Sequence, residues 1–385
     1  MVDQRFPRPL SRRKLIAGAT AGVVVPAALA PPILATAALA QPSPAAAVTR
    51  RVTVYAEAVE GGLFGYGLAP GEATIPGPTL EMWEGDTLEI ELVNSTDQRL
   101  SIHPHGVDYS TDSDGSPMND SACAPGETRT YTWRSRTASK LNDSNWIPGS
   151  AGYWHYHDHA LGTDHGTTGV AKGLYGALVV RKRGDLLPDR QFVCVFNEMT
   201  INNQMAPNTP MYEARLGERV EWIAIGHGNQ PHTFHVHAHR WADNRTGMLS
   251  GAGDRTAVID NKDLNPGCSF GFQVIAGQGV GAGAWMYHCH VQFHSDGGMV
   301  GVFLVRNADG TMPPGAQEAI DRFHGHEPHA HSSTPPQTSV PTQVPPLAKP
   351  VQKLPPAEPH AVGPRAGKRI DHQPTGQGTP GHGGH

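Results

Sequence analysis

A short stretch near residue 290, WMYHCHVQFHSDGGM (285–299), concentrates side chains that bind metals. Cys289 lies between His288 and His290, and His294 and Met299 follow it at equal spacings. A thiolate, two imidazoles and a weak thioether are the ligands of a blue-copper electron-transfer site. An upstream histidine would complete this set, and His232 is placed to supply it. The stretch therefore predicts a copper site that transfers single electrons.

Four His-x-His pairs form a second group of candidate metal ligands. Residues i and i+2 of a strand point to the same face, so each pair presents two imidazoles about 7 Å apart. This spacing suits two neighbouring metal ions better than one. Two of the pairs lie within triplets, in which spacing alone does not identify the ligands: His155, His157 and His159, and His235, His237 and His239. The pairs are His103/His105, His157/His159, His235/His237 and His288/His290.

The segments that must position these residues are typical of β-strands. Short apolar or alternating runs are separated by clusters of Gly, Pro, Asn and Asp, and no long run has the 3.6-residue apolar period of a helix. This pattern predicts an all-β protein built from sandwiches or barrels. The expected strands are Arg51–Ala58, Thr87–Val93, Thr128–Arg134, Gly176–Val180, Gln191–Phe196, Arg219–Ile225, Ser269–Ile275 and Met299–Val305.

An internal repeat divides the core of the chain. Residues 84–185 and 216–310 each run from a strand into a His-x-His pair, then to a second pair, and then to a closing apolar strand. This order predicts two homologous β-domains, at residues 45–188 and 189–310.

The two ends of the chain differ from this core. Ser11-Arg12-Arg13-Lys14, followed by an alanine-rich apolar run and Ala38-Leu39-Ala40, predicts a cleaved twin-arginine signal peptide at residues 1–40. The protein is then expected in the periplasm or outside the cell, with no membrane attachment after cleavage. Residues 311–385 are rich in Pro, Gln, Thr and His, which predicts a disordered tail. We leave open whether its histidines capture copper.

Charge and cysteine content exclude two classes of protein. The formal net charge of −5, without a basic stripe, argues against nucleic acid as a partner. The four cysteines do not form a dense disulfide framework, and if Cys289 binds copper, at least one other stays unpaired.

The sequence HCHVQFHSDGGM, together with HPHG, YHDH and HTFHVH, resembles the copper signatures of two-domain bacterial multicopper oxidases, the small laccases. The resemblance covers nearly all of residues 50–310. It implies two cupredoxin-like Greek-key domains and four copper ions per chain, and it excludes His155, His165, His227 and His239 as ligands. It implies a type 1 copper on His232, Cys289, His294 and Met299, a type 2 copper on His103 and His235, and a type 3 pair on His105, His157, His159, His237, His288 and His290.

These sites together fit the four-electron reduction of dioxygen to water by a reductant that gives one electron at a time. Cys289 would connect the sites, because its sulfur binds one copper while its chain neighbours bind two others. Asp114 is a candidate proton relay that follows the first pair, although a turn role explains it equally well. Tyr109 is a candidate redox-active side chain, although a packing role is also open. Phenols are the expected reductants.

The ligands are divided between the two repeats, so assembly is part of the prediction. A two-domain chain can complete the cluster by pairing its first domain with the second domain of a neighbour, and such head-to-tail contacts close into rings. The resemblance implies a homotrimer.

Three other functions remain as alternatives. Copper nitrite reductases also have two such domains, but they need no type 3 pair. A cuprous or other metal-ion oxidase is possible, although no methionine-rich insert is evident. A copper-storage or electron-transfer protein would not need a cysteine between paired histidines.

Overall fold

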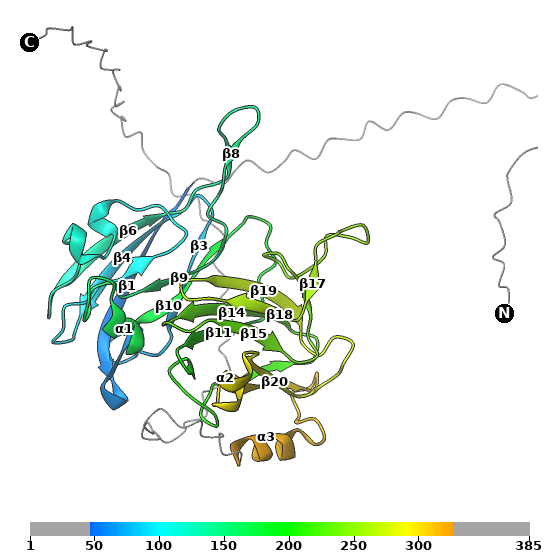
Figure 1. The fold of residues 1–385 in the computed structure, drawn as a ribbon. Helices are drawn as coiled ribbons and strands as arrows, with labels where there is room; N and C mark the ends of the chain where they lie inside the picture. Colours follow the sequence, from blue (N-terminus) through cyan, green and yellow to red (C-terminus); the bar gives the residue numbers. More distant parts are fainter. Residues whose placement is uncertain (1–46, 326–385) are drawn as a thin grey trace, which may run out of the picture. The chain divides into compact units, whose positions relative to one another are not determined.

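The structure is a computed structural model, and it describes residues 47–325, which are mostly β-strand (Figure 1). The predicted all-β fold is confirmed. The predicted signal peptide and residues 326–385 of the predicted tail lie outside the described residues. Among the residues that are described, no helix is long and apolar enough to span a bilayer.

Domain 1, the part of the chain from β1 to β10, is a sandwich of two four-stranded sheets. The parallel pairs β1–β4 and β3–β10 lie among antiparallel neighbours, as crossing Greek-key connections require. One sheet has the order β2 (Leu63–Gly67), β1 (Thr49–Val59), β4 (Thr87–Asn94), β6 (Thr128–Arg134), and the other has the order β3 (Gly77–Trp83), β10 (Tyr175–Arg181), β9 (Gly152–His157), β5 (His103–Pro104).

Domain 2, from β11 to β21, repeats this plan with sheets of four and five strands. Its parallel pairs are β11–β14 and β13–β21. One sheet has the order β12 (Thr200–Ile201), β11 (Arg190–Asn197), β14 (Arg219–His227), β19 (Ser269–Ile275), and the other has the order β13 (Tyr212–Arg215), β21 (Val300–Arg306), β20 (Gly283–Cys289), β15 (His232–Val236), β18 (Asn261–Leu264).

The remaining elements are short. Two small hairpins pair β7 (Ser139–Lys140) with β8 (Trp146–Ile147) and β16 (Trp241–Ala242) with β17 (Val258–Ile259). The helices are α1 (Thr167–Ala171), α2 (Gln292–Asp296) and α3 (Ala316–His324), with 3-10 turns η1 (Glu60–Gly62), η2 (Thr111–Ser113) and η3 (Pro117–Asn119).

Alternating side chains explain why these segments form half-buried strands. In β4, Leu88, Ile90 and Leu92 are buried in the core of domain 1, while Glu89 and Glu91 point away from it. In β14, by contrast, the side chains on both faces are buried, because the face that points away from the core of domain 2 packs against domain 1. There Ile223 and Ile225 join Tyr175, Ala177 and Val179 of domain 1 in a shared apolar cluster.

A buried ionic network also joins the two domains. The guanidinium of Arg181 in β10 donates two hydrogen bonds, of 2.5 and 2.7 Å, to the carboxylate of Glu221 in β14. It also donates to Glu81 of β3 at 2.5 Å, and Tyr153 donates its hydroxyl to Glu221 at 2.7 Å. The side chains of Arg181 and Glu221 are 2 % and 0 % exposed. Burial alone would raise the pKa of Glu221, but the hydrogen bonds and charge of Arg181 outweigh it and lower that pKa.

The carboxyl end of domain 2 extends beyond the predicted boundary at residue 310. The sequence places residues 311–325 in a disordered tail, but α3 forms within them and lies beside β20 (Figure 1). Ala316 and Ile320 of this helix are buried against Val302 and Leu304 of β21. The helix is only nine residues long, and its apolar side is too short to stand out against the surrounding Pro, Gln and Thr.

Candidate metal centre

The first group of predicted ligands, His232, Cys289 and His294, meets inside domain 2. His232 begins β15, Cys289 ends β20 and His294 lies in α2. The Cys289 Sγ lies 3.7 Å from His232 Nδ1 and 3.5 Å from His294 Nδ1. All three side chains are buried, and Nε2 of both histidines has no hydrogen-bond partner. A sulfur and two imidazoles that converge in this way suit a copper ion. We call these three residues the thiolate site.

Met299 lies directly beside the thiolate site. Its N–H donates to the carbonyl of His294 at 2.9 Å, and its carbonyl accepts the N–H of Cys289 at 3.0 Å. The side chain is fully buried in the core of domain 2. The chain thus turns back after α2, and the backbone of Met299, the predicted fourth ligand, lies beside both His294 and Cys289.

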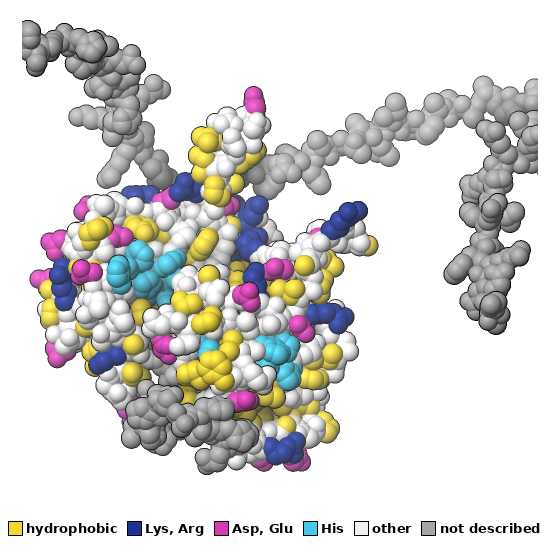
Figure 2. Space-filling model, in the orientation of Figure 1, with side chains coloured by type: hydrophobic (Ala, Val, Ile, Leu, Met, Phe, Trp, Pro, Cys, Tyr) yellow, Lys and Arg dark blue, Asp and Glu magenta, His cyan; other side chains and the backbone are white. Residues whose placement is uncertain are grey.

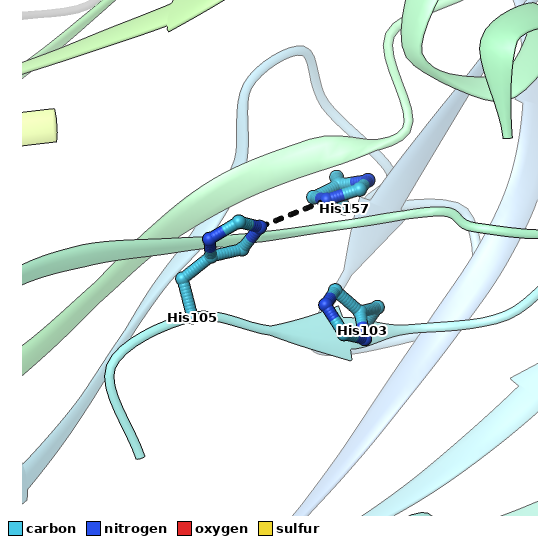
Figure 3. A group of neighbouring side chains, drawn as sticks. All are labelled: His103, His105 and His157. Atoms are coloured by element: carbon cyan, nitrogen blue, oxygen red, sulfur yellow. Dashed lines mark hydrogen bonds between the residues drawn. The ribbon is translucent and has the colours of Figure 1, made fainter. Parts of the chain in front are cut away.

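His103, His105 and His157 form a second group, in domain 1 (Figure 3). One ring nitrogen of each lies within 4.8 Å of the others, and Nε2 of His105 lies 3.1 Å from Nε2 of His157. His103 and His157 are directly opposite each other across β5 and β9. The ring of His159 lies 4.9 Å from that of His103. We call these four histidines half-site 1.

Domain 2 carries a matching group, which we call half-site 2. His235, His237 and His288 again place one nitrogen each within 4.8 Å of the others, and Nε2 of His237 lies 3.2 Å from Nε2 of His288. His235 is opposite His288 across β15 and β20, and the ring of His290 lies 5.3 Å from His235. The two half-sites therefore occupy the same strands of the two repeats.

Backbone carbonyls orient two histidines of each half-site. The Nδ1 of His157 donates to the carbonyl of Asp158, and the Nδ1 of His288 donates to that of Cys289, both at 2.7 Å. The Nδ1 atoms of His103 and His235 likewise donate to the carbonyls of Asp114 at 2.5 Å and Asp260 at 2.6 Å. Such bonds fix the tautomer and leave Nε2 free as a ligand.

Burial favours the neutral form of three of the predicted ligands, His105, His232 and His288, and the neutral form is the one that binds a metal. Burial is the largest cause that lowers the pKa of His105 to about 4, with a further contribution from His103. Burial likewise lowers the pKa of His288 to about 4 and that of His232 to about 4. Near neutral pH all three are free of a second proton.

The two half-sites do not meet within one chain. Figure 2 shows histidine side chains gathered in two separate patches on the face in view. Within residues 47–325, no hydrogen bond or ring contact joins a member of half-site 1 to a member of half-site 2. Each half-site gathers four imidazoles from its own domain alone.

Of the four histidines that the resemblance excludes as ligands, three lie against half-site 1, and the fourth, His239, lies within domain 2. His239 uses both ring nitrogens, since Nδ1 donates to the carbonyl of His237 and Nε2 accepts the N–H of Gly277. His155 stacks on His105 with ring centroids 3.9 Å apart, and its nitrogens are buried without partners. The rings of His227 and His165 lie against His157 and His159.

Asp114 and Tyr109 both lie at half-site 1. The carboxylate of Asp114 lies 3.5 Å from Nδ1 of His103 and accepts hydrogen bonds from Ser116 and Asn119. The ring of Tyr109 lies edge-on, 5.6 Å from that of His103, and is partly exposed. Both predicted side chains are thus brought to the histidine expected to hold the type 2 copper.

Sequence reasoning missed Asp158, which follows His157 as Cys289 follows His288. Its buried carboxylate accepts N–H groups of Ser101 at 2.7 Å, Leu161 at 2.8 Å and Ala160 at 3.2 Å. Domain 1 therefore has a hydrogen-bonded carboxylate where domain 2 has the thiol of the thiolate site. Alignment of YHDH with YHCH gives the signal that could have found it.

All four cysteines are free. Cys123, Cys194 and Cys289 are buried, and Cys268 is exposed. The thiol of Cys289 is thus available to a metal and is not held in a disulfide.

Comparisons with known proteins agree with this geometry. Two family models described as multicopper oxidase match residues 71–185 and 186–309. The chain is 32% identical over 268 residues to a probable nitrite reductase-hydroxylamine oxidoreductase fusion protein of Kuenenia stuttgartiensis, covering 63% of the chain and 29% of that protein. It is 28% identical over 286 residues to the ferroxidase HEPHL1 of Homo sapiens, covering 60% and 23%. The chain thus spans about a quarter of the length of these curated relatives.

A solved structure shows the same fold. Copper nitrite reductase from Nitrosomonas europaea superposes with a TM-score of 0.50 at 19% identity, over 67% of this chain and 94% of that one. This similarity supports the cupredoxin-like form of both domains. The two family models together match residues 71–309, and so the chain belongs to the multicopper oxidase family, a family of copper-containing oxidoreductases.

Proposed function

We propose that this protein is a laccase-type oxidase, which oxidises phenols one electron at a time and reduces dioxygen to water. Four phenols each give up one electron and one proton, and dioxygen takes up four of each to form two water molecules. The observation that carries the proposal is the position of Cys289. Its sulfur faces His232 and His294, while the adjacent His288 belongs to half-site 2.

Strand geometry explains how one segment serves two sites. Successive side chains of β20 point to opposite faces, so Cys289 enters the core while His288 faces outward. Bound copper would supply one-electron chemistry at the thiolate site and dioxygen reduction where the half-sites join. The protein's own part is to hold the two sites a single residue apart along the chain.

The proposed ligands are those that the resemblance implies, namely the thiolate site, Met299 and the eight histidines of the two half-sites. Type 1 copper takes the thiolate site with Met299, type 2 copper takes His103 and His235, and the type 3 pair takes the other six histidines of the half-sites. This assignment uses all eight imidazoles of the two half-sites. A nitrite reductase, with its two coppers, would leave most of them unused.

Metal content and oxygen uptake test the proposal. We expect about four copper ions per chain, a blue absorption band, and oxygen uptake with phenols and methoxyphenols. About two coppers per chain with turnover of nitrite would replace the proposal by nitrite reduction. Oxygen uptake that responds to cuprous or ferrous ions and not to phenols would replace it by metal-ion oxidation.

Asp114 is proposed to relay protons to half-site 1. Its carboxylate lies beside His103 and is oriented by Ser116 and Asn119. Asp114→Asn keeps the shape but removes the proton-accepting oxygen. We expect oxygen turnover to slow by roughly a hundredfold, while reduction of the type 1 site in stopped flow keeps its rate. Equal slowing of both steps would contradict the relay. Tyr109→Phe tests the redox role of Tyr109 in the same assay.

We also propose that the chain works as a ring-shaped homotrimer. Half-site 1 and half-site 2 are each open within one chain, so the half-site 1 of one chain needs the half-site 2 of another. Head-to-tail pairing of this kind closes into a ring. The cluster would then lie at each subunit interface. A fully active monomer in analytical ultracentrifugation would contradict it.

Complementation between inactive variants tests the shared cluster directly. His105→Ala damages half-site 1 and His237→Ala damages half-site 2, so each variant alone should be inactive. If the cluster forms between chains, co-expression of both variants joins intact halves and restores about a quarter of the sites. If it forms within one chain, the co-expressed pair stays inactive. The matched control is a single chain that carries both substitutions, His105→Ala and His237→Ala, and it should stay inactive in either case.

Export by the twin-arginine route to the periplasm or beyond is proposed on the amino-terminal sequence. Expression with Arg12 and Arg13 replaced by lysine should leave the protein in the cytoplasm. Its appearance in the periplasm of such cells would contradict the route.

A further inference from the structure

We infer that the hairpin Asn197–Gln204, and Glu198 within it, positions the thiolate site. The inference rests on the proposed function only in taking the thiolate site as a copper site. The hairpin joins β11 to β12, with Phe196 opposite Ile201 and Asn197 opposite Thr200. It contains none of the predicted ligands, and no sequence motif marks it. Its contacts give it a role, because it touches the loop that precedes His232 and the turn that follows His294.

The first contact is made by the Glu198 carboxylate. Its Oε1 accepts the backbone N–H of Asn229 at 2.9 Å and the side-chain amide of Asn229 at 2.6 Å. Asn229 lies three residues before His232, in the loop that leads from β14 into β15. Gly228 in the same loop has a φ of +76°, and a Cβ there would lie 2.8 Å from Glu198 Oε1. The loop before His232 is therefore closely fitted to this carboxylate.

The second contact is apolar. A Cβ on Gly297 would lie 2.7 Å from the Cε of Met199, so the Met199 side chain packs directly on the turn between His294 and Met299. The ring of Phe196, at the base of the hairpin, lies edge-on to the His232 ring at 5.6 Å. One short hairpin thus contacts both the loop that leads into His232 and the turn that follows His294.

The backbone at Glu198 supports a specific role. Its φ is +51°, a left-handed value that residues other than Gly, Asn and Asp rarely adopt. A two-residue hairpin turn usually takes Asn or Gly at such a position. Glutamate is a poor choice for the turn alone, so its long carboxylate is the feature that the position uses.

The hairpin is itself anchored on domain 1. The side-chain amide of Asn197 donates to the carbonyl of Val170 at 3.1 Å, and that of Asn203 donates to the carbonyl of Ala171 at 3.0 Å. Tyr175 donates its hydroxyl to Asn203 at 2.6 Å. Both carbonyls belong to α1, so the hairpin links the surroundings of the thiolate site in domain 2 to a helix of domain 1.

Three variants separate the carboxylate from the turn. Glu198→Asn keeps a residue that tolerates the left-handed backbone but is too short to reach Asn229. Glu198→Gln keeps an acceptor oxygen at full length. Asn229→Ala removes the side-chain amide, one of the two donors to Glu198, and leaves the backbone N–H of residue 229 in place. A positioning role predicts that Asn229→Ala has a smaller effect of the same kind as Glu198→Asn, that their double variant is no worse than Glu198→Asn, and that Glu198→Gln stays close to wild type.

The measurements are the blue band, the copper electron paramagnetic resonance spectrum and the copper retained against a chelator. We expect Glu198→Asn to shift the band and to weaken copper retention at the thiolate site about tenfold, the low end for groups that orient metal ligands. The type 3 absorption should not change. A lower melting temperature with unchanged spectra and retention would overturn the inference. If the wild-type protein binds blue copper but shows no oxidase activity, the proposed function is overturned. The effect of Glu198→Asn on the blue band can still be measured in that case.

Discussion

Cys289→Ser is expected to abolish both the blue colour and the oxidation of phenols. The Cys289 sulfur is the donor that faces both His232 and His294, and a serine hydroxyl at this position is a far weaker copper ligand. Without the thiolate, the protein cannot take up electrons from phenols one at a time. The histidines of both half-sites do not depend on this sulfur, so the type 3 pair should still form. Visible absorption and oxygen uptake measure the two outcomes.

Copper analysis and a second cysteine make this test specific. Cys289→Ser should lose about one copper ion per chain and retain the absorption of the type 3 pair. Cys268→Ser is the matched control, because Cys268 is free and exposed and touches no predicted ligand. It should keep full colour and activity. A blue band that survives Cys289→Ser would refute the type 1 assignment.

Arg181→Met is expected to destabilise the fold by about 3–5 kcal/mol, because it leaves the buried Glu221 carboxylate without its partner. Glu221 receives two of its hydrogen bonds from Arg181, and neither side chain is open to solvent. Since the pair joins domain 1 to domain 2, the loss should appear as earlier separation of the domains. Chemical denaturation followed by tryptophan fluorescence measures it.

Two controls identify the mechanism of this loss. Arg99→Met removes an exposed ion pair with Asp120, and it should cost less than about 1 kcal/mol. Arg181→Met combined with Glu221→Gln removes the unpaired charge and should recover part of the stability. The lowered pKa of Glu221 adds a pH signature. Its stabilisation is present above the ordinary pKa of a glutamate and is lost as pH falls through the lowered pKa, and the double variant should lack this loss. Equal effects of Arg99→Met and Arg181→Met would contradict the argument.

The strands and the ligand pairs could be predicted because they follow from local periodicity. The expected strands at Thr128–Arg134 and Ser269–Ile275 coincide with β6 and β19. Burial alternates in the second half of β6, whereas the middle of β19 is buried on both faces. The same period of two places His288 on the face opposite to Cys289. These features need only the sequence of one strand.

Contacts between distant segments could not be predicted in the same way. Glu221 and Glu89 occupy equivalent strand positions, yet one meets a buried arginine at a domain interface and the other an exposed one. Nothing within either strand shows which face a second domain will cover. The Glu198–Asn229 contact joins residues 31 positions apart. It also depends on a left-handed backbone at Glu198, a conformation that a glutamate in the sequence does not predict. The helix at residues 316–324 likewise depends on the sheet that it covers.

Asp158 has a consequence for the order in which the protein matures. In domain 1 a permanently present carboxylate ties the segment after β9 to its own backbone N–H groups, so this domain can reach its final form without any metal. Domain 2 has a thiol at the matching point, which is a weaker acceptor of such bonds than a carboxylate, so we expect its corresponding loop to be held less firmly until a metal is bound. Domain 1 is therefore expected to reach its final form before domain 2, whose loop after Cys289 should become ordered when the metal binds. In metal-free protein, backbone amides after Asp158 should exchange with deuterium slowly, and those between Cys289 and Met299 quickly.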